Sequence, residues 1–190
     1  VGHRDVMRCF ERWFRRAQLP LSFSEGFHPK PRVTFPAPLA VGIEGLDEVM
    51  ELELSESWKA EALRARLVRH SPPGLHLRSV EMLPAGTPKV QPRAFRYRVV
   101  VPPGLHAGMA DAVDRLRASA SAPVARSRGR APVDVRPLLD AIEFRDGVLS
   151  MRILVPPSGG VSPADVFAAL GRPNLPREGA GIERTAVEVR

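Results

Sequence analysis

Cysteine is nearly absent from this sequence. Cys9 is the single cysteine among 190 residues, which excludes an intramolecular disulfide framework and every metal or iron–sulfur site that needs several thiolates. We therefore expect no metal site and no cofactor. A chain with one thiol is typical of a reducing compartment, so a cytoplasmic protein is expected.

Long apolar runs and the common catalytic motifs are also missing. No stretch of 18 uninterrupted apolar residues occurs, so we expect no membrane-spanning helix. The polar first residues lead directly into a helical pattern, which predicts that no signal peptide is present. The sequence contains no P-loop, no G-x-G-x-x-G after a predicted strand and no G-x-S-x-G elbow. These absences favour a non-catalytic protein.

Lysine is scarce, and arginine supplies most of the positive charge. Lys30, Lys59 and Lys89 are the only lysines among 28 basic residues, against 21 acidic residues, for a net charge of +7. The charge is segregated, at about +4 over residues 1–32 and about −6 over residues 33–63. A segregated basic charge favours a polyanionic partner. We expect RNA as that partner, with no sequence-specific binding to DNA and no membrane.

The clearest element is an amphipathic helix near the start of the chain. Asp5 stands at its first turn, and Pro20 ends it. Apolar residues recur with the 3.6-residue helical period and are expected to face the core, which makes Cys9 a core thiol. They are Val6, Cys9, Phe10, Trp13, Phe14 and Ala17. Basic residues on the opposite face and its flank are predicted to contact RNA phosphates. They are Arg8, Arg12, Arg15 and Arg16.

Further elements are predicted in two halves of the chain. In the first half we expect strands over residues 33–41, 48–54 and 75–83 and a helix over residues 58–70. Residues 84–92 contain three prolines and no apolar pattern, which predicts a linker.

The second half alternates strands with helices. Asp146-Gly147 is a strong turn signal for a hairpin, and Ser162-Pro163 is typical of a helix start. The expected elements are a strand from Phe95, a helix over 105–120, strands over 135–144 and 148–155, a helix over 162–170 and a strand over 182–189.

This order predicts the fold class. The second half has the order β-α-β-β-α-β, which is the split βαβ or ferredoxin-like pattern. The first half has the same order without the opening strand. We therefore predict an α+β protein with two tandem ferredoxin-like modules, the first lacking its opening strand. The first module covers residues 1–83, the linker residues 84–92 and the second module residues 93–190.

The loop over residues 22–32 is the most distinctive stretch. Gly26 frees the backbone at a turn, while Pro29 and Pro31 stiffen the loop. Phe27 is predicted to fill the core, and the alternative is that it stacks on a base. Three hydrogen-bond donors of the loop are added to the predicted RNA contacts. They are His28, Lys30 and Arg32.

Several blocks carry a resemblance to a known family. They are Gly2-His3-Arg4-Asp5-Val6, Arg15-Arg16-Ala17-Gln18-Leu19-Pro20, Ser24-Glu25-Gly26-Phe27-His28-Pro29-Lys30-Pro31-Arg32, Pro38-Leu39-Ala40-Val41-Gly42, Val133-Asp134-Val135-Arg136-Pro137 and Glu183-Arg184. On these blocks the chain resembles the radical SAM-linked protein family. The sequence departs from the family pattern at Arg4, His28 and Lys30. The matching motif residues are His3, Asp5, Gly26, Phe27, Pro29 and Pro31.

The resemblance implies a domain that follows, or is fused to, a cobalamin-binding radical SAM protein. We therefore expect a non-catalytic accessory module that binds a structured RNA and works with a radical SAM enzyme. Arg93, Arg96 and Arg98 in the second half are predicted to form a second basic strip.

Three questions stay open at this point. The arginines could instead dock on an acidic protein partner. His3 and His28 could act as acid and base in a metal-independent ribonuclease. The basic stretch that contains Arg126, Arg128 and Arg130 is either an RNA-contacting arm or a solvated segment.

Overall fold

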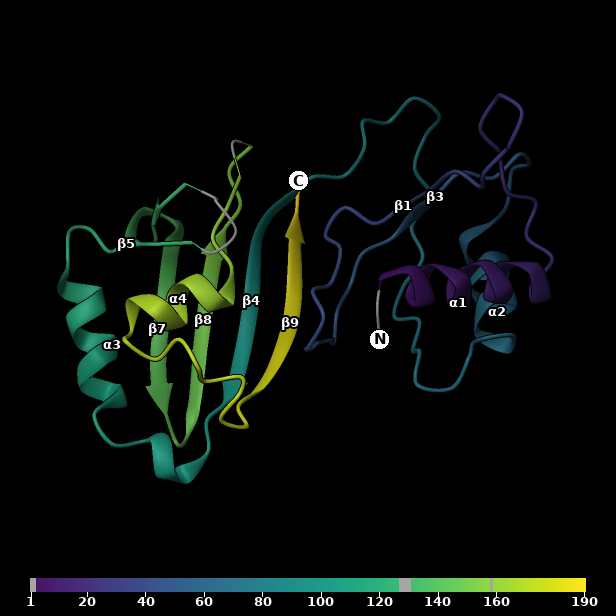
Figure 1. Cartoon of the computed structure of the whole chain (residues 1–190). Helices are drawn as coiled ribbons and strands as arrows, with labels where there is room; N and C mark the ends of the chain where they lie inside the picture. The colour runs from purple at the N-terminus through teal and green to yellow at the C-terminus, as the bar shows by residue number, and fades with distance from the viewer. Residues whose placement is uncertain (1–2, 127–130, 158) are drawn as a thin grey trace. The chain divides into compact units, whose positions relative to one another are not determined.

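The computed structural model describes residues 3–126, 131–157 and 159–190, with the backbone alone at residues 3 and 4. The fold is α+β, and the chain divides into two units (Figure 1). Unit one comprises the residues up to Val41 together with Met50–Val90, and unit two comprises Gly42–Val49 and Gln91–Arg190. The chain therefore passes between the units three times.

Unit one is built around two helices, α1 (His3–Arg16) and α2 (Ala60–Arg69). The fully buried residues of their cluster are Trp13, Phe14, Leu63 and Leu67. The apolar stripe predicted for the first helix is confirmed in its second half. Cys9 lies closer to the helix start, where the cluster ends, and is only half-buried. The prediction that it is a core thiol is therefore wrong.

The strands of unit one are much shorter than predicted. β1 (Val33–Thr34) pairs antiparallel with β3 (Glu51–Leu52), where the sequence predicted strands over 33–41 and 48–54. Two prolines inside the first range cannot donate to a strand ladder. Residues 75–83, all described, form no strand at all. Leu75, Leu77 and Val80 of this range pack on the helix cluster without belonging to a strand, whereas Met82 and Leu83 are exposed.

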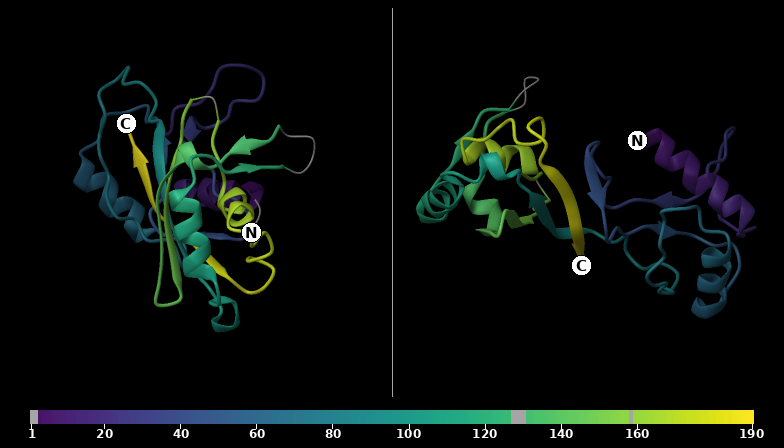
Figure 2. Two further views of the ribbon diagram at one scale, coloured as in Figure 1. Left: turned by 90° about the vertical axis from the view of Figure 1, so that its left-hand side faces the viewer. Right: turned by 90° about the horizontal axis from the view of Figure 1, so that it is seen from below.

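Unit two contains the larger sheet. Its strands are β2 (Ile43–Gly45), β4 (Pro92–Val100), β7 (Leu139–Arg145), β8 (Val148–Leu154) and β9 (Gly181–Val189). The order across the sheet is β2-β9-β4-β8-β7, and every neighbouring pair is antiparallel except the parallel pair of β2 and β9. α3 (Met109–Ala118) and α4 (Pro163–Ala169) cover one face of this sheet (Figures 1 and 2). Each of the two helices connects two parallel strands that have one antiparallel strand between them.

The elements predicted for the second half are present in unit two. The hairpin of β7 and β8 turns at Asp146 and Gly147, whose φ values are +50° and +76°, as a type I′ turn requires. Ser162 caps α4 in a capping box, with Pro163 at the first helical position. The residues that α3 buries are Met109, Ala112, Val113 and Leu116. Shorter elements complete the unit: η1 (Pro103–Leu105), β5 (Pro123–Val124), β6 (Val133–Asp134), which pairs with β5, and η2 (Arg136–Leu138).

No helix in the described ranges is long and apolar enough to cross a membrane.

One segment from the first half of the sequence belongs to unit two. β2 lies beside β9, and the amide of Leu46 donates to the carbonyl of Arg184 at 3.0 Å. The side chain of Arg184 is 4% exposed, and its guanidinium donates to both carboxylate oxygens of Glu48. The predicted first module, residues 1–83, contained this whole segment. The difference arises because the two paired residues are 136 positions apart, beyond the reach of any local pattern.

The residues around Arg184 stabilise its buried positive charge. Its burial alone would lower its pKa, and the carboxylate of Glu48 overrides that effect, so the pKa lies above its ordinary value. The ring centroid of Phe95 lies 4.9 Å from the guanidinium carbon, a cation–π contact. A Cβ at Gly45 would stand 2.7 Å from Cγ of Glu48. A larger residue at Gly45 would therefore displace the carboxylate.

We predict that Glu48→Gln lowers the free energy of unfolding of unit two by about 2–4 kcal/mol. Removing one partner of a fully buried ion pair costs about 3–5 kcal/mol, and the side chain of Glu48 is 31% exposed. The matched control is Glu44→Gln on β2, four residues before Glu48, where an exposed carboxylate is lost and a change within about 0.5 kcal/mol is expected. Native-state hydrogen exchange of the β9 amides measures unit two alone. Equal effects of the two substitutions would contradict the prediction.

Candidate nucleic-acid interface

The outer face of α1 carries four exposed arginines. They are Arg8, Arg12, Arg15 and Arg16. Within the part of the chain that the structure describes, the first three have no carboxylate partner. Glu11 is also exposed on this helix, but its single negative charge is outnumbered by the four arginines, so the face remains positive. The arginines predicted from the helical period are therefore available to a polyanion.

α2 holds this face in place. The indole N–H of Trp13 donates to the carbonyl of Leu67 at 3.0 Å. Arg66 reaches back to the end of α1, where it donates to the carbonyl of Ala17 at 2.6 Å and to the side-chain oxygen of Gln18 at 2.8 Å. The last carbonyls of a helix lack intrahelical partners, so Arg66 serves as a cap. Its charge is committed to the fold and is not part of the exposed face.

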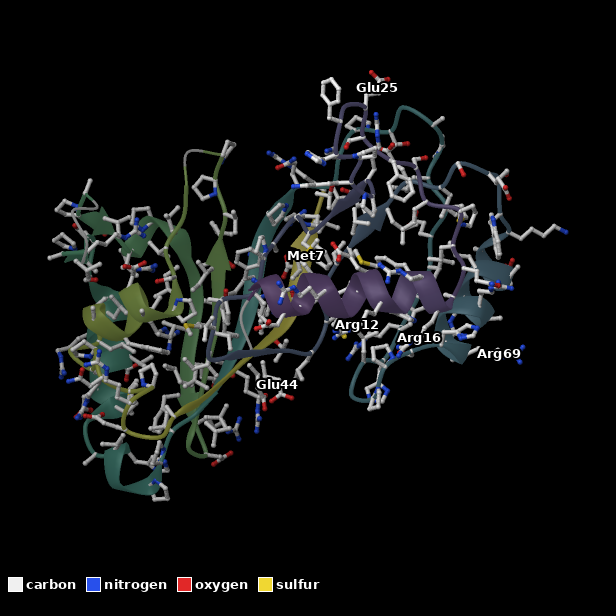
Figure 3. All side chains as sticks on the ribbon, turned by 45° about the vertical axis from the view of Figure 1, so that its right-hand side comes forward. Met7, Arg12, Arg16, Glu25, Glu44 and Arg69 are labelled. Atoms are coloured by element: carbon white, nitrogen blue, oxygen red, sulfur yellow. The ribbon has the colours of Figure 1, made fainter. Side chains whose placement is uncertain are left out.

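The end of α2 extends the basic face. Arg16 donates to the carbonyl of His70 at 3.2 Å, which brings it beside the exposed Arg69. Figure 3 shows Arg12, Arg16 and Arg69 on the same side of α1. We call Arg8, Arg12, Arg15, Arg16 and Arg69 the α1–α2 basic surface. Sequence reasoning missed Arg69, although its place in the last turn of a predicted helix was a usable signal.

The loop that follows α1 lies elsewhere. Figure 3 shows Glu25, at the loop tip, on the side of α1 opposite to Arg12 and Arg16. His28 and Lys30 are exposed, as predicted for ligand contacts. The tip of the loop, at Glu25, therefore lies apart from Arg12 and Arg16.

Phe27 is not a core residue. Its side chain is 102% exposed, so the prediction that it fills the core is wrong. The cause is the closure of the loop behind it: the amide of Ser24 donates to the carbonyl of Lys30 at 2.8 Å, and the amide of Lys30 donates to the hydroxyl of Ser24 at 3.0 Å. These bonds make a narrow hairpin whose tip stands in solvent.

Four other predicted RNA contacts lie in ion pairs. Arg32 bonds Glu53 at 3.2 Å. On the sheet of unit two, Arg96 bonds Glu188 at 2.7 Å and Arg98 bonds Glu183 at 3.0 Å, and Arg93 lies 4.0 Å from Glu188. These cations are already held by carboxylates, with Glu188 shared between Arg93, Arg96 and Arg152, so phosphate must compete with the carboxylates. The predicted second strip is therefore a much weaker candidate than the α1–α2 basic surface.

Glu188 is the centre of a charge network on the sheet face that α3 and α4 leave uncovered. Arg152 donates to both of its carboxylate oxygens, at 2.9 and 2.5 Å, and to Asp140 at 2.7 Å. The hydrogen bonds from Arg152, supported by Arg96, lower the pKa of Glu188 to about 2. This face is held together by its own charges.

The basic stretch around residue 126 has a structural role at its start. Arg126 forms a two-point ion pair with Asp165, at 3.1 and 2.9 Å, and donates to the carbonyl of Gly160 at 2.7 Å. This anchors the N-terminus of α4, because Asp165 also completes the capping box. Arg128 and Arg130 lie outside the described residues.

The histidine pair considered for catalysis falls partly outside the described residues. The side chain of His3 lies outside the described residues, and His28 is exposed near the loop tip. Among the described residues, no group of three or more histidine, cysteine, aspartate and glutamate side chains could hold a metal ion.

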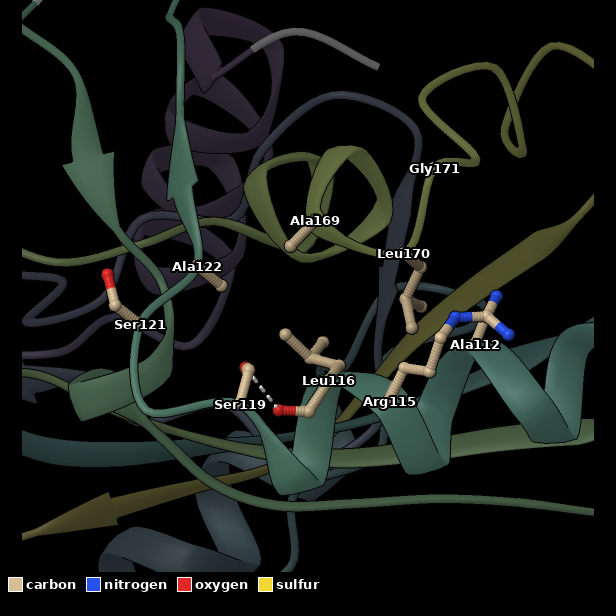
Figure 4. A pocket seen from close by; sticks show the side chains of 9 residues that line it. All are labelled: Ala112, Arg115, Leu116, Ser119, Ser121, Ala122, Ala169, Leu170 and Gly171. Atoms are coloured by element: carbon tan, nitrogen blue, oxygen red, sulfur yellow. Dashed lines mark hydrogen bonds between the residues drawn. The ribbon is translucent and has the colours of Figure 1, made fainter.

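A shallow pocket of about 390 Å³ lies between α3 and α4 (Figure 4). Its hydroxyl groups are already engaged, because Ser119 donates to the carbonyl of Leu116 at 2.8 Å and Ser121 donates to Asp134 at 2.7 Å. The remaining lining is largely apolar, with Arg115 as its one charged side chain. The pocket therefore offers little to recognise a polar ligand.

The charge network of unit two predicts a pH dependence of stability. The pKa of Glu188 is depressed in the folded state, so its stabilising contribution is complete above about pH 4.5 and is lost as the pH falls to about 2. We expect the free energy of unfolding to fall less steeply across this range in Glu188→Gln than in the wild type. Glu143→Gln, an exposed carboxylate on the same sheet, is the control and should retain the wild-type slope. Urea unfolding at successive pH values measures the free energy of unfolding. Identical slopes against pH for all three proteins would contradict the stabilising role of Glu188.

A comparison with known protein families gives one match. The profile described as "Uncharacterized protein conserved in bacteria (DUF2344)" matches residues 1–163. No curated protein and no solved structure matches the chain. Because the matched region covers most of the sequence, the chain belongs to this bacterial DUF2344 family.

Proposed function

We propose that the protein is a non-catalytic RNA-binding module and that the α1–α2 basic surface holds RNA phosphates. The observation that carries the proposal is the exposed row of Arg8, Arg12 and Arg15, which have no carboxylate partner among the described residues. Arginine suits this task because its planar guanidinium can donate two hydrogen bonds to one phosphate.

The rigidity of the surface supports the same proposal. The hydrogen bonds of Trp13 and Arg66 fix α1 against α2 before any ligand arrives. Binding therefore has to order only the arginine side chains and not the helix that carries them. On unit two, the predicted contacts Arg93, Arg96 and Arg98 are held in ion pairs, whereas Arg8, Arg12 and Arg15 on unit one have no carboxylate partner among the described residues.

We further infer that the setting is a radical SAM system, as the family resemblance implies. A single cysteine cannot hold the iron–sulfur cluster of such an enzyme. The cluster would therefore reside in the partner protein, and this module would present the RNA to it in the cytoplasm. The remaining candidate functions are docking on an acidic protein surface and RNA cleavage by His3 and His28.

The split βαβ order of unit two supports a ferredoxin-like module there. Unit one would then be a reduced module of the same kind, with its opening strand missing and two-residue strands in place of a full sheet. This remains part of the proposal.

We predict that the triple substitution Arg8→Glu, Arg12→Glu and Arg15→Glu weakens RNA binding by at least ~100-fold. Several phosphate contacts of ~1 kcal/mol each are lost together, and the slope of log K against log salt should become shallower by about 2 to 3. Filter binding of a structured RNA at a series of salt concentrations measures both quantities. The fold should persist, because exposed charges contribute only about 0–1 kcal/mol each.

The matched control has the same change in charge on unit two: Arg117→Glu, Arg145→Glu and Arg177→Glu, all at exposed positions. We expect the control to weaken binding by less than about threefold, since it alters only the long-range field. Equal losses in the two triple variants would mean that net charge alone drives binding. Unchanged affinity in a folded α1 variant would favour the acidic protein partner.

A further inference from the structure

The tip of the loop over residues 24–30 is a preorganised element of unit one. Its base is closed by the two hydrogen bonds between Ser24 and Lys30 and by a bridge between Phe23 and Pro31. Arg32 adds a hydrogen bond from its side chain to the carbonyl of Phe23 at 3.2 Å. The tip is therefore presented on a closed stem.

The backbone at the tip turns the aromatic ring outwards. Gly26 has a φ of +116°, a conformation that side chains disfavour, while a Cβ there would meet nothing within 4 Å. Conformation and not lack of space therefore requires the glycine. Phe27 follows it and has the highest exposure of the large apolar side chains described. A single exposed apolar residue is ordinary by itself. Whether Phe27 contacts a ligand must therefore be argued from the residues around it.

That chemistry matches one nucleotide. His28 and Lys30 are exposed within three residues of Phe27, and neither has an ion-pair partner in the described ranges. A flat ring close in sequence to an ammonium group and an imidazole offers a stacking partner for a base and hydrogen-bond donors for its phosphate. An apolar pocket on another protein would match the ring and leave the donors unused. Glu25 is the one charge at the tip that opposes a phosphate (Figure 3).

We infer that the loop tip binds an unpaired nucleotide of the RNA, with Phe27 stacked on the base and Lys30 and His28 facing the phosphate. The inference rests on the proposed RNA-binding function and adds a substrate class to it. Paired bases present only their edges in an RNA helix, so Phe27 would select a bulge, a loop or a single strand. The α1–α2 basic surface, on the other side of α1, would hold the flanking stem.

The test compares two RNAs with the same stem, one fully paired and one with a bulge of unpaired adenosines. The wild type should prefer the bulged RNA by about 5- to 150-fold, which is the range for stacking of one base. Phe27→Ala should bind both RNAs with the affinity that the wild type has for the paired one. Phe27→Trp should keep the preference, and its added tryptophan fluorescence should be quenched by the bulged RNA alone.

Removing the negative charge at the loop tip should have the opposite effect on RNA affinity. Glu25→Gln removes the repulsion at the tip and should strengthen binding of the bulged RNA by about two- to threefold. All of these side chains are in solvent, so thermal unfolding of the full chain should not change in any variant.

The outcomes separate this inference from the proposed function. Equal affinity of the wild type for the two RNAs, or a preference that Phe27→Ala retains, overturns the role of the loop while the arginine surface can still bind. Absence of salt-dependent binding to either RNA overturns both.

Discussion

The guanidinium of Arg184 is enclosed in unit two, and the structure around it follows from the need to compensate its charge. An isolated buried cation costs several kcal/mol, and the compensating carboxylate, Glu48, comes from the first half of the chain. To deliver it, β2 leaves unit one and pairs with β9, and Gly45 leaves room for the carboxylate. Unit one is therefore formed by two separate stretches of sequence. Two of the three covalent crossings between the units arise because residues 42–49, which carry β2 and Glu48, belong to unit two.

The arginines of this basic protein divide into two groups. Members of the first are held by carboxylates or carbonyls and stabilise the fold: Arg184 with Glu48, Arg152 with Glu188, and Arg126 with Asp165 are examples. The second group lies on the α1–α2 basic surface, where Arg8, Arg12 and Arg15 have no carboxylate partner among the described residues. The net charge of +7 therefore says little by itself about ligand binding. A partner RNA would meet the second group, because contact with the first would require an internal ion pair to break.

Some of the residues that carry the family resemblance hold the fold together, and others are exposed to solvent. Asp134 accepts hydrogen bonds from Ser121 and from the amides of Ala122 and Arg136, which lower its pKa, and it thereby ties β6 to the end of α3. The motif of the loop, in contrast, leaves its aromatic residue in solvent. A motif read from sequence does not separate these cases, which is why Phe27 was predicted to be buried.

The sequence by itself determined the helices and the order of elements in unit two, because the 3.6-residue period, the Asp146-Gly147 turn and the Ser162 cap are local signals. It also located the exposed face of α1. Only the tertiary structure decided that residues 42–49 belong to unit two, that 75–83 form no strand, and which arginines remain unpaired. The physical reason is the same in each case. Whether a strand finds an edge or a guanidinium finds a carboxylate depends on residues as far apart as the 136 positions between Glu48 and Arg184, and no local pattern contains that information.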